Sequence, residues 1–164
     1  MAKILFTKQE IQNKVMELAF DLNRELDDAT FLVVTSGATL FAMDLFKEMD
    51  FPCRLDFIKI KSYEGENQGI LQRRSDAQLK YDENDTIVII EDIVDSGTTI
   101  KYLKEYINQC LGVSKILVVS LLYKEKSKHL VDYPGFLVQE DDFVFGYGLD
   151  LDEYDRNHNN IYKK

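Results

Sequence analysis

Cysteine is scarce in this sequence, and long hydrophobic runs are missing. Cys53 and Cys110 are the two cysteines, and their spacing fits neither a disulfide framework nor a metal site. We therefore expect reduced thiols and a cytoplasmic protein. No apolar stretch approaches the roughly 20 residues of a membrane-spanning helix, so we expect no membrane partner. The first six residues are too short a hydrophobic run for a signal peptide, and they lack a cleavage region.

Positive charge is also in short supply. Lysine and arginine number 20 against 29 acidic residues, which gives a net charge of −9. This balance repels nucleic acid, so we expect no nucleic-acid partner, and a phosphate site must be built locally from backbone amides and a few basic side chains. At 164 residues, with 45% hydrophobic and 30% charged residues, the composition is that of a single globular domain with its own core.

Helical and strand patterns alternate along the chain. Apolar spacing predicts two helices and three buried strands outside the central motif, at 7–26, 38–49, 31–34, 55–61 and 114–122. Thr7, three residues before Glu10, is expected to cap the first helix. Such alternation is typical of an α/β domain with a parallel sheet.

Three segments look irregular. Residues 62–80 lack a regular period and contain two glycines, and loops of this length in compact domains are often functional lids. Residues 133–136, Tyr-Pro-Gly-Phe, predict a turn. The polar tail at 157–164 is expected to fray.

The most informative stretch is 87–100. Four β-branched apolar residues, 87–90, predict a strand buried on both faces, and Glu91 and Asp92 follow where it would end. Next comes Asp-Ser-Gly-Thr-Thr at 95–99, at the start of a helical pattern that Gly112 closes. Unpaired amides at a helix start can hold a phosphate, and adjacent acids can hold sugar hydroxyls, Mg²⁺ or both. Taken alone, however, the Asp-Ser-Gly-Thr turn is more often an ordinary helix cap.

The motif of two acids, two apolar residues and Asp-Ser-Gly-Thr-Thr resembles the signature of the type I phosphoribosyltransferases, which bind 5-phosphoribosyl-1-pyrophosphate (PRPP). Segments 55–63, 142–150 and 153–157 are similar to the hypoxanthine–guanine branch of that family. The likeness runs from about Thr7 to Asn157. It implies the type I phosphoribosyltransferase fold, an α/β fold with a parallel sheet flanked by helices and a small hood subdomain.

The resemblance also implies a domain organisation and a reaction. The domain would span 1–164, with a core at about 31–123 and a hood from the N-terminal segment and about 124–156. The reaction would be Mg²⁺-dependent transfer of phosphoribose from PRPP to hypoxanthine or guanine, with xanthine a further candidate, giving IMP or GMP and pyrophosphate in purine salvage. The alternative is a regulator of the same fold that senses PRPP or nucleotides without efficient turnover. Family members are usually oligomers, so we expect a homodimer or homotetramer.

Several roles on the PRPP side follow from the resemblance. The 5′-phosphate would be wrapped by Asp95, Ser96, Gly97, Thr98 and Thr99. Glu91 and Asp92 would meet the ribose hydroxyls, with Mg²⁺ bound nearby. Asp95 would also be the general base for the purine N7 proton; the structural alternative is that it only caps the helix.

On the purine side, Lys124 would donate to the 6-oxo oxygen and Phe143 would stack on the ring. Val144 would offer backbone groups to the purine edge. Asp150 would bind a second Mg²⁺ from the pyrophosphate side, close to the base. From residue type alone, a lysine after a strand is usually solvated, and an aromatic residue in a short apolar strand is more often core.

Around pyrophosphate the resemblance is less complete. Arg156 would contact pyrophosphate, and Lys128 would lie near it or be a solvated surface charge. Ser36 and Gly37 stand where the family commonly has Lys-Gly, often joined by a cis peptide bond. Serine cannot supply the positive charge of that lysine. We nevertheless expect the Ser36–Gly37 peptide to keep the strained backbone. Ser62 and Tyr63 would begin the flexible lid over the reaction centre.

Overall fold

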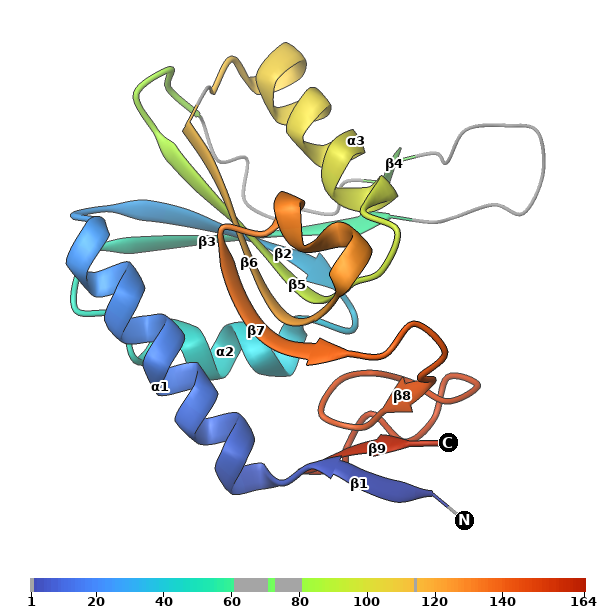
Figure 1. Ribbon diagram of the computed structural model, residues 1–164. Coiled ribbons are helices and arrows are strands. Elements are labelled where there is room, and N and C mark those ends of the chain that lie inside the picture. Colours follow the sequence, from blue (N-terminus) through green and yellow to red (C-terminus); the bar gives the residue numbers. More distant parts are fainter. Residues whose placement is uncertain (1, 61–70, 73–80, 114) are drawn as a thin grey trace, which may run out of the picture.

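A six-stranded sheet forms the centre of the molecule (Figure 1). The computed structural model describes residues 2–60, 71–72, 81–113 and 115–164. The strands, in spatial order, are β4 (Leu71–Gln72), β3 (Cys53–Ile60), β2 (Ala29–Thr35), β5 (Thr86–Val94), β6 (Lys115–Lys124) and β7 (Tyr133–Val138). Five of them are parallel, and β4 is antiparallel to β3. The α/β prediction is confirmed.

Helices cover both faces of this sheet. One face carries α1 (Lys8–Glu25) and α2 (Thr39–Lys47), and the other carries α3 (Thr98–Tyr106), which continues as the π-helical segment η1 (Ile107–Leu111). Alternate residues of β5 enter the two cores. Val88 and Ile90 pack on the side of α1 and α2, whereas Ile87 and Ile89 pack on the side of α3. The predicted strand buried on both faces is therefore confirmed.

The expected cap of the first helix is present. The Glu10 amide donates to the Thr7 hydroxyl at 3.3 Å, and the Thr7 amide donates to the Glu10 carboxylate at 2.8 Å. These two bonds satisfy backbone donors that the helix itself leaves unpaired. They fix where α1 begins, and its apolar stripe is then buried against the sheet.

A second, antiparallel sheet joins the two ends of the chain. Its order is β1 (Lys3–Phe6), β9 (Ile161–Lys163) and β8 (Val144–Phe145), and the termini lie side by side in Figure 1. The prediction of a fraying tail is therefore wrong. Ile161 is fully buried, and the Tyr162 ring stacks on Phe145 with centroids 5.4 Å apart, which fixes the tail by packing.

The prediction of a turn at 133–136 is also wrong, because these residues begin β7. Proline lacks an amide donor and is tolerated in edge strands, and among the described strands β7 pairs with β6 alone. Gly135 does not form a bend; it allows the backbone of β7 to lie close to that of β6. A Cβ at this position would lie 2.2 Å from the Leu121 carbonyl oxygen.

Two strands are longer than expected. Strand β5 continues to Val94, so Glu91 and Asp92 lie within it, and β6 includes Lys124. In the segment expected to be a loop, 71–72 pair with β3; Ser62 and Tyr63 lie outside the described residues. Among the described helices, none is long and apolar enough to cross a membrane.

Candidate active site

The turn at 95–99 joins β5 to α3. Gly97 precedes α3 with φ of 77°, and a Cβ there would lie 2.1 Å from a methyl carbon of Leu130, so glycine suits both the backbone and the space. The Ser96 hydroxyl lies 3.0 Å from the Thr98 hydroxyl and accepts the Thr98 amide at 3.3 Å. The turn lines a cavity of about 110 Å³ together with Glu91, Ile93, Val94 and Ile100. Hydroxyls and a helix N-terminus at one cavity suit an anion.

Glu91 and Asp92, the acidic pair, lie on β5 beside this turn. Glu91 is buried and Asp92 half-buried. Burial, then the charge of Asp92, raises the pKa of Glu91 well above its ordinary value, and burial also raises the pKa of Asp92. A cation would relieve this crowding of negative charge.

The donor set of the acidic pair fits Mg²⁺. This ion prefers oxygen ligands and is usually held by one or two carboxylates together with substrate phosphates and water. Within the described ranges, no cluster of three or more metal-binding side chains occurs. Two adjacent carboxylates match the protein's share of such a ligand set.

Three backbone segments converge on Asp92. A Cβ at Gly37 would lie 1.7 Å from Asp92 Oδ2, and a Cβ at Gly148 would lie 2.2 Å from the Gly37 carbonyl oxygen. Arg156 donates from Nη1 to the Gly148 carbonyl at 2.7 Å and pairs through Nη2 with Asp150 at 2.9 Å. Its positive charge opposes the effect of burial on the pKa of Asp92. The structure thus places Gly37 against Asp92 and Arg156 near enough to act on its charge, and Arg156 in turn pairs with Asp150.

The unusual peptide lies one residue earlier than expected. Among the described residues, the cis peptide bond joins Thr35 to Ser36, so the expectation for Ser36–Gly37 is wrong in position. Ser36 itself is exposed. The close packing of Gly37 against Asp92 described above belongs to the residue after this bond.

Two lysines hold Asp95. Lys124 Nζ lies 3.1 Å from Asp95 Oδ2 and also donates to the Glu140 carbonyl at 2.7 Å. Lys126 Nζ lies 2.8 Å from Asp95 Oδ1 and 2.8 Å from the Glu140 carboxylate. Hydrogen bonds from Lys126 and Lys124 lower the pKa of Asp95 below its usual value. Sequence reasoning missed Lys126 and Glu140. The Lys-Glu-Lys run at 124–126, after a buried strand, was the available signal for Lys126.

Phe143 differs from what its residue type alone predicts, whereas Lys128 agrees with it. Phe143, just before β8, is 53% exposed, and Lys164 lies 6.0 Å from its ring centroid, so it is not a core residue. Val144 is buried. Lys128 is exposed on the 3₁₀ helix η2 (Glu125–Leu130) and makes no ion pair within the described part of the chain.

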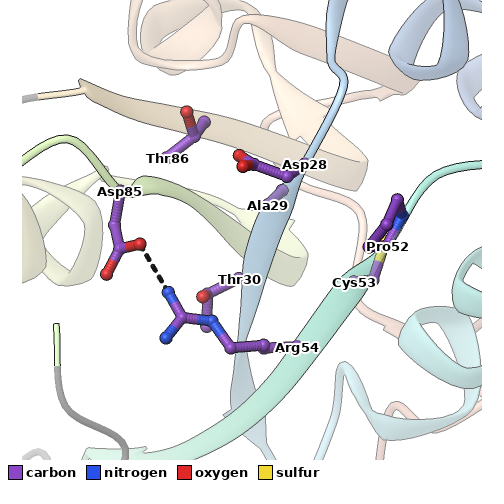
Figure 2. A pocket seen from close by; sticks show the side chains of 8 residues that line it. All are labelled: Asp28, Ala29, Thr30, Pro52, Cys53, Arg54, Asp85 and Thr86. Carbon is purple, nitrogen blue, oxygen red and sulfur yellow. Dashed lines mark ion pairs between the residues drawn. The ribbon is translucent and has the colours of Figure 1, made fainter. Parts of the chain in front are cut away.

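A larger cavity, of about 260 Å³, opens at the opposite edge of the sheet, where β2, β3 and β5 begin (Figure 2). Its lining is Asp28, Ala29, Thr30, Pro52, Cys53, Arg54, Asp85 and Thr86, which includes none of the expected site residues. Arg54 and Asp85 form an ion pair of 2.6 Å there. Burial raises the pKa of the Cys53 thiol to about 11. Open α/β sheets bind ligands beyond the carboxyl ends of their strands, so the 95–99 edge is the better candidate.

Known proteins share this arrangement of the chain. The phosphoribosyl transferase domain family matches residues 1–153. A hypoxanthine-guanine phosphoribosyltransferase of Bacillus subtilis is 39% identical over 162 residues, covering 94% of this chain and 88% of that protein. The bifunctional protein TilS/HprT of Listeria innocua is 36% identical over 94% of this chain, which spans only 24% of that relative's length.

A solved structure agrees with these sequence relatives. The hypoxanthine-guanine phosphoribosyltransferase of Bacillus anthracis, crystallised with HEPES in its active site, superposes with a TM-score of 0.88 at 27% identity. The match covers 99% of this chain and 98% of that one. With the sheet, the 95–99 turn and the acidic pair in place, the chain belongs to the phosphoribosyltransferase family, and within it to the hypoxanthine-guanine phosphoribosyltransferases.

Proposed function

We propose that this chain transfers the 5-phosphoribosyl group from PRPP to hypoxanthine or guanine, with release of pyrophosphate, as a step of purine salvage. The observation that carries the proposal is the meeting of three features at one edge of the sheet. These are the cavity at the 95–99 turn, the acidic pair, and the contact of 3.1 Å between Asp95 and Lys124. The relatives carry the name of this reaction.

On the PRPP side, the 95–99 turn would bind the 5′-phosphate through amides and hydroxyls. Glu91 and Asp92 would bind the ribose hydroxyls and Mg²⁺ together. Mg²⁺, when bound, would neutralise the charge of the departing pyrophosphate. Arg156 is the cation best placed to contact pyrophosphate, because it lies beside Gly148 and near Asp92.

Other residues complete the pyrophosphate side of the proposal. Asp150, paired with Arg156, would bind a second Mg²⁺ once substrate oxygens are present. Ser36 and Gly37 would offer backbone groups, since the packing of Gly37 on Asp92 brings this loop to the acidic pair. Lys128 would add a charge from η2.

On the purine side, Asp95 would accept the N7 proton while N9 attacks the ribose carbon. Lys124 would donate to the 6-oxo oxygen, and its burial favours a fixed position for this donor. Phe143 would stack on the ring, which its exposed face permits, and Val144 would present backbone groups. The three-stranded sheet that carries Val144 would act as the hood of a single domain.

A purine panel tests the proposed function. The protein is incubated with PRPP, Mg²⁺ and one of hypoxanthine, guanine, xanthine or adenine, and the products are identified by mass. We expect IMP and GMP, far less product from adenine, and loss of turnover with a chelator that added Mg²⁺ reverses. PRPP binding without any nucleotide product would instead support the regulator, the alternative that Ser36 in place of the usual lysine favours.

The assembly and location remain proposals of the same kind. We propose a homodimer or homotetramer in the cytoplasm. Light scattering of the purified protein measures the assembly directly. A monomer at all concentrations would contradict it.

A further inference from the structure

Both carboxylate oxygens of Asp95 are engaged by ammonium groups. Lys126 occupies Oδ1 at 2.8 Å and Lys124 occupies Oδ2 at 3.1 Å. An oxygen that accepts a proton from a purine must face the purine N–H. Each carboxylate oxygen has a second lone pair, but an ammonium group on that oxygen competes with the purine N–H for the same negative charge. A base therefore binds Asp95 more tightly once one lysine has withdrawn.

The two lysines differ in their freedom to withdraw. The Lys124 side chain is only 9% exposed and is fixed a second time by the Glu140 carbonyl. The Lys126 side chain is 50% exposed and has a second partner of its own, the Glu140 carboxylate at 2.8 Å. Lys126 can leave Asp95 and keep one ion pair, because Glu140 still holds it.

Resting on the proposed function, we propose that Lys126 and Glu140 are positioning residues that set the affinity for the purine. Lys126 competes with the purine for Asp95, and Glu140 holds Lys126 when the purine takes its place. The proton from purine N7 passes to Asp95. Lys126 moves as an ammonium ion and neither gains nor loses a proton.

The charge states of the three groups agree with this exchange. Hydrogen bonds from Lys126 and then Lys124 lower the pKa of Asp95, so it is ionised and open to competition between donors. Hydrogen bonds to Asp95 and then Glu140 raise the pKa of Lys126, so it stays charged at neutral pH.

The proposal predicts opposite effects for two substitutions. In Lys126→Met the competitor is gone, and KM for hypoxanthine, measured at saturating PRPP, should fall by about 1.5- to 5-fold, the range for a half-exposed ion pair. In Glu140→Gln the alternative partner is lost, so Lys126 stays on Asp95 and KM should rise by a similar factor. The backbone carbonyl that holds Lys124 is kept. Because saturating purine displaces Lys126 in either case, kcat should change little.

The double variant Lys126→Met/Glu140→Gln should behave like Lys126→Met alone, because Glu140 acts through Lys126. Lys115→Met, which removes an exposed lysine at the start of β6, is the matched control and should leave KM unchanged. Thermal melting of each variant verifies that the fold is kept.

The possible results separate this inference from the proposed function. Two results together support the inference. The KM for hypoxanthine shifts in opposite directions in the two single variants, and adding Glu140→Gln to Lys126→Met leaves KM unchanged. Shifts of the same sign, no shifts, or changes confined to kcat overturn it while the wild type still makes IMP. A wild-type protein without turnover on any purine overturns the proposed function and this inference with it.

Discussion

Gly37 packs directly onto the Asp92 carboxylate: a Cβ added to Gly37 would lie 1.7 Å from Oδ2 and 2.6 Å from Cγ. Neither atom belongs to the flexible end of a long side chain, and Asp92 is held further by the Ile93 amide, which donates to Oδ1 at 2.9 Å. The loop after β2 and the acidic pair on β5 therefore fix each other's positions. This contact connects the pyrophosphate side of the proposed site to its ribose side.

Gly37→Ala should lower turnover by about 100-fold, because the added methyl group displaces Asp92 and a misplacement of about 1 Å can have an effect of this size. The rate of IMP formation with saturating PRPP and hypoxanthine measures it. Wild-type turnover in this variant would show that the contact does not matter to the reaction.

Gly112→Ala is the matched control for the glycine substitution. Gly112 has φ of 69°, and a Cβ there meets nothing within 4 Å. Alanine at positive φ costs about 1 kcal/mol or more of folding free energy. Thermal melting should show this loss, while the turnover at a temperature well below the transition stays that of the wild type.

Asp95→Asn should depress turnover by about 10²- to 10⁴-fold, because the amide cannot accept the N7 proton. Binding of PRPP should change far less, since the amides and hydroxyls of the 95–99 turn remain. Titration calorimetry with PRPP and single-turnover kinetics separate the two effects. Asp27→Asn, an exposed acid after α1, is the control, and full turnover in Asp95→Asn would remove the general-base role.

Lys124→Met should weaken the preference for 6-oxopurines over adenine. Methionine keeps the apolar stem that the site buries but loses the donor. A hydrogen bond from a charged group contributes about 1.5–3 kcal/mol, so the ratio of kcat/KM for hypoxanthine to that for adenine should drop by about 10- to 100-fold. An unchanged ratio would contradict the contact with the 6-oxo oxygen.

Asp85→Asn should lower stability in a pH-dependent way. The hydrogen bond from Arg54 lowers the pKa of Asp85, so the ion pair of Figure 2 contributes stability above the unfolded pKa of about 3.9 and loses it as pH falls through the folded pKa. Because both groups are partly exposed, we expect a difference below about 1 kcal/mol at pH 7.

Thermal melting of wild type and Asp85→Asn between pH 7 and pH 3 measures this dependence. The difference in Tm should shrink on acidification. A difference that stays constant over the whole range would mean that the charge of Asp85 is not its source. Because the cavity of Figure 2 lies at the opposite edge of the sheet, IMP formation should be unaffected.

The sequence predicted best what local pattern determines. The run of four β-branched residues in β5 and the Thr7–Glu10 cap depend on neighbours a few residues apart, and both predictions were confirmed. The prediction of a turn at 133–136 was wrong because a Pro-Gly pair normally marks a turn. Here the edge position of β7 tolerates Pro134, and the nearness of Leu121 requires Gly135.

The site residues were missed where their partners lie far along the chain. Nothing local in Glu140 indicates that its carboxylate reaches Lys126 and its carbonyl reaches Lys124. Likewise, the polar tail gives little sign that Ile161 is buried between strands from both ends of the chain. Tertiary packing, which residue type alone does not encode, decides these positions.

The place of β9 between β1 and β8 has a consequence for the order of folding. Among the described strands, β1 pairs with β9 alone, so its hydrogen bonds require two segments that are far apart in the sequence to meet. Contacts between distant segments form slowly, because the chain between them loses entropy first. The parallel sheet, whose neighbouring strands are closer in the sequence, is therefore expected to assemble before the smaller sheet.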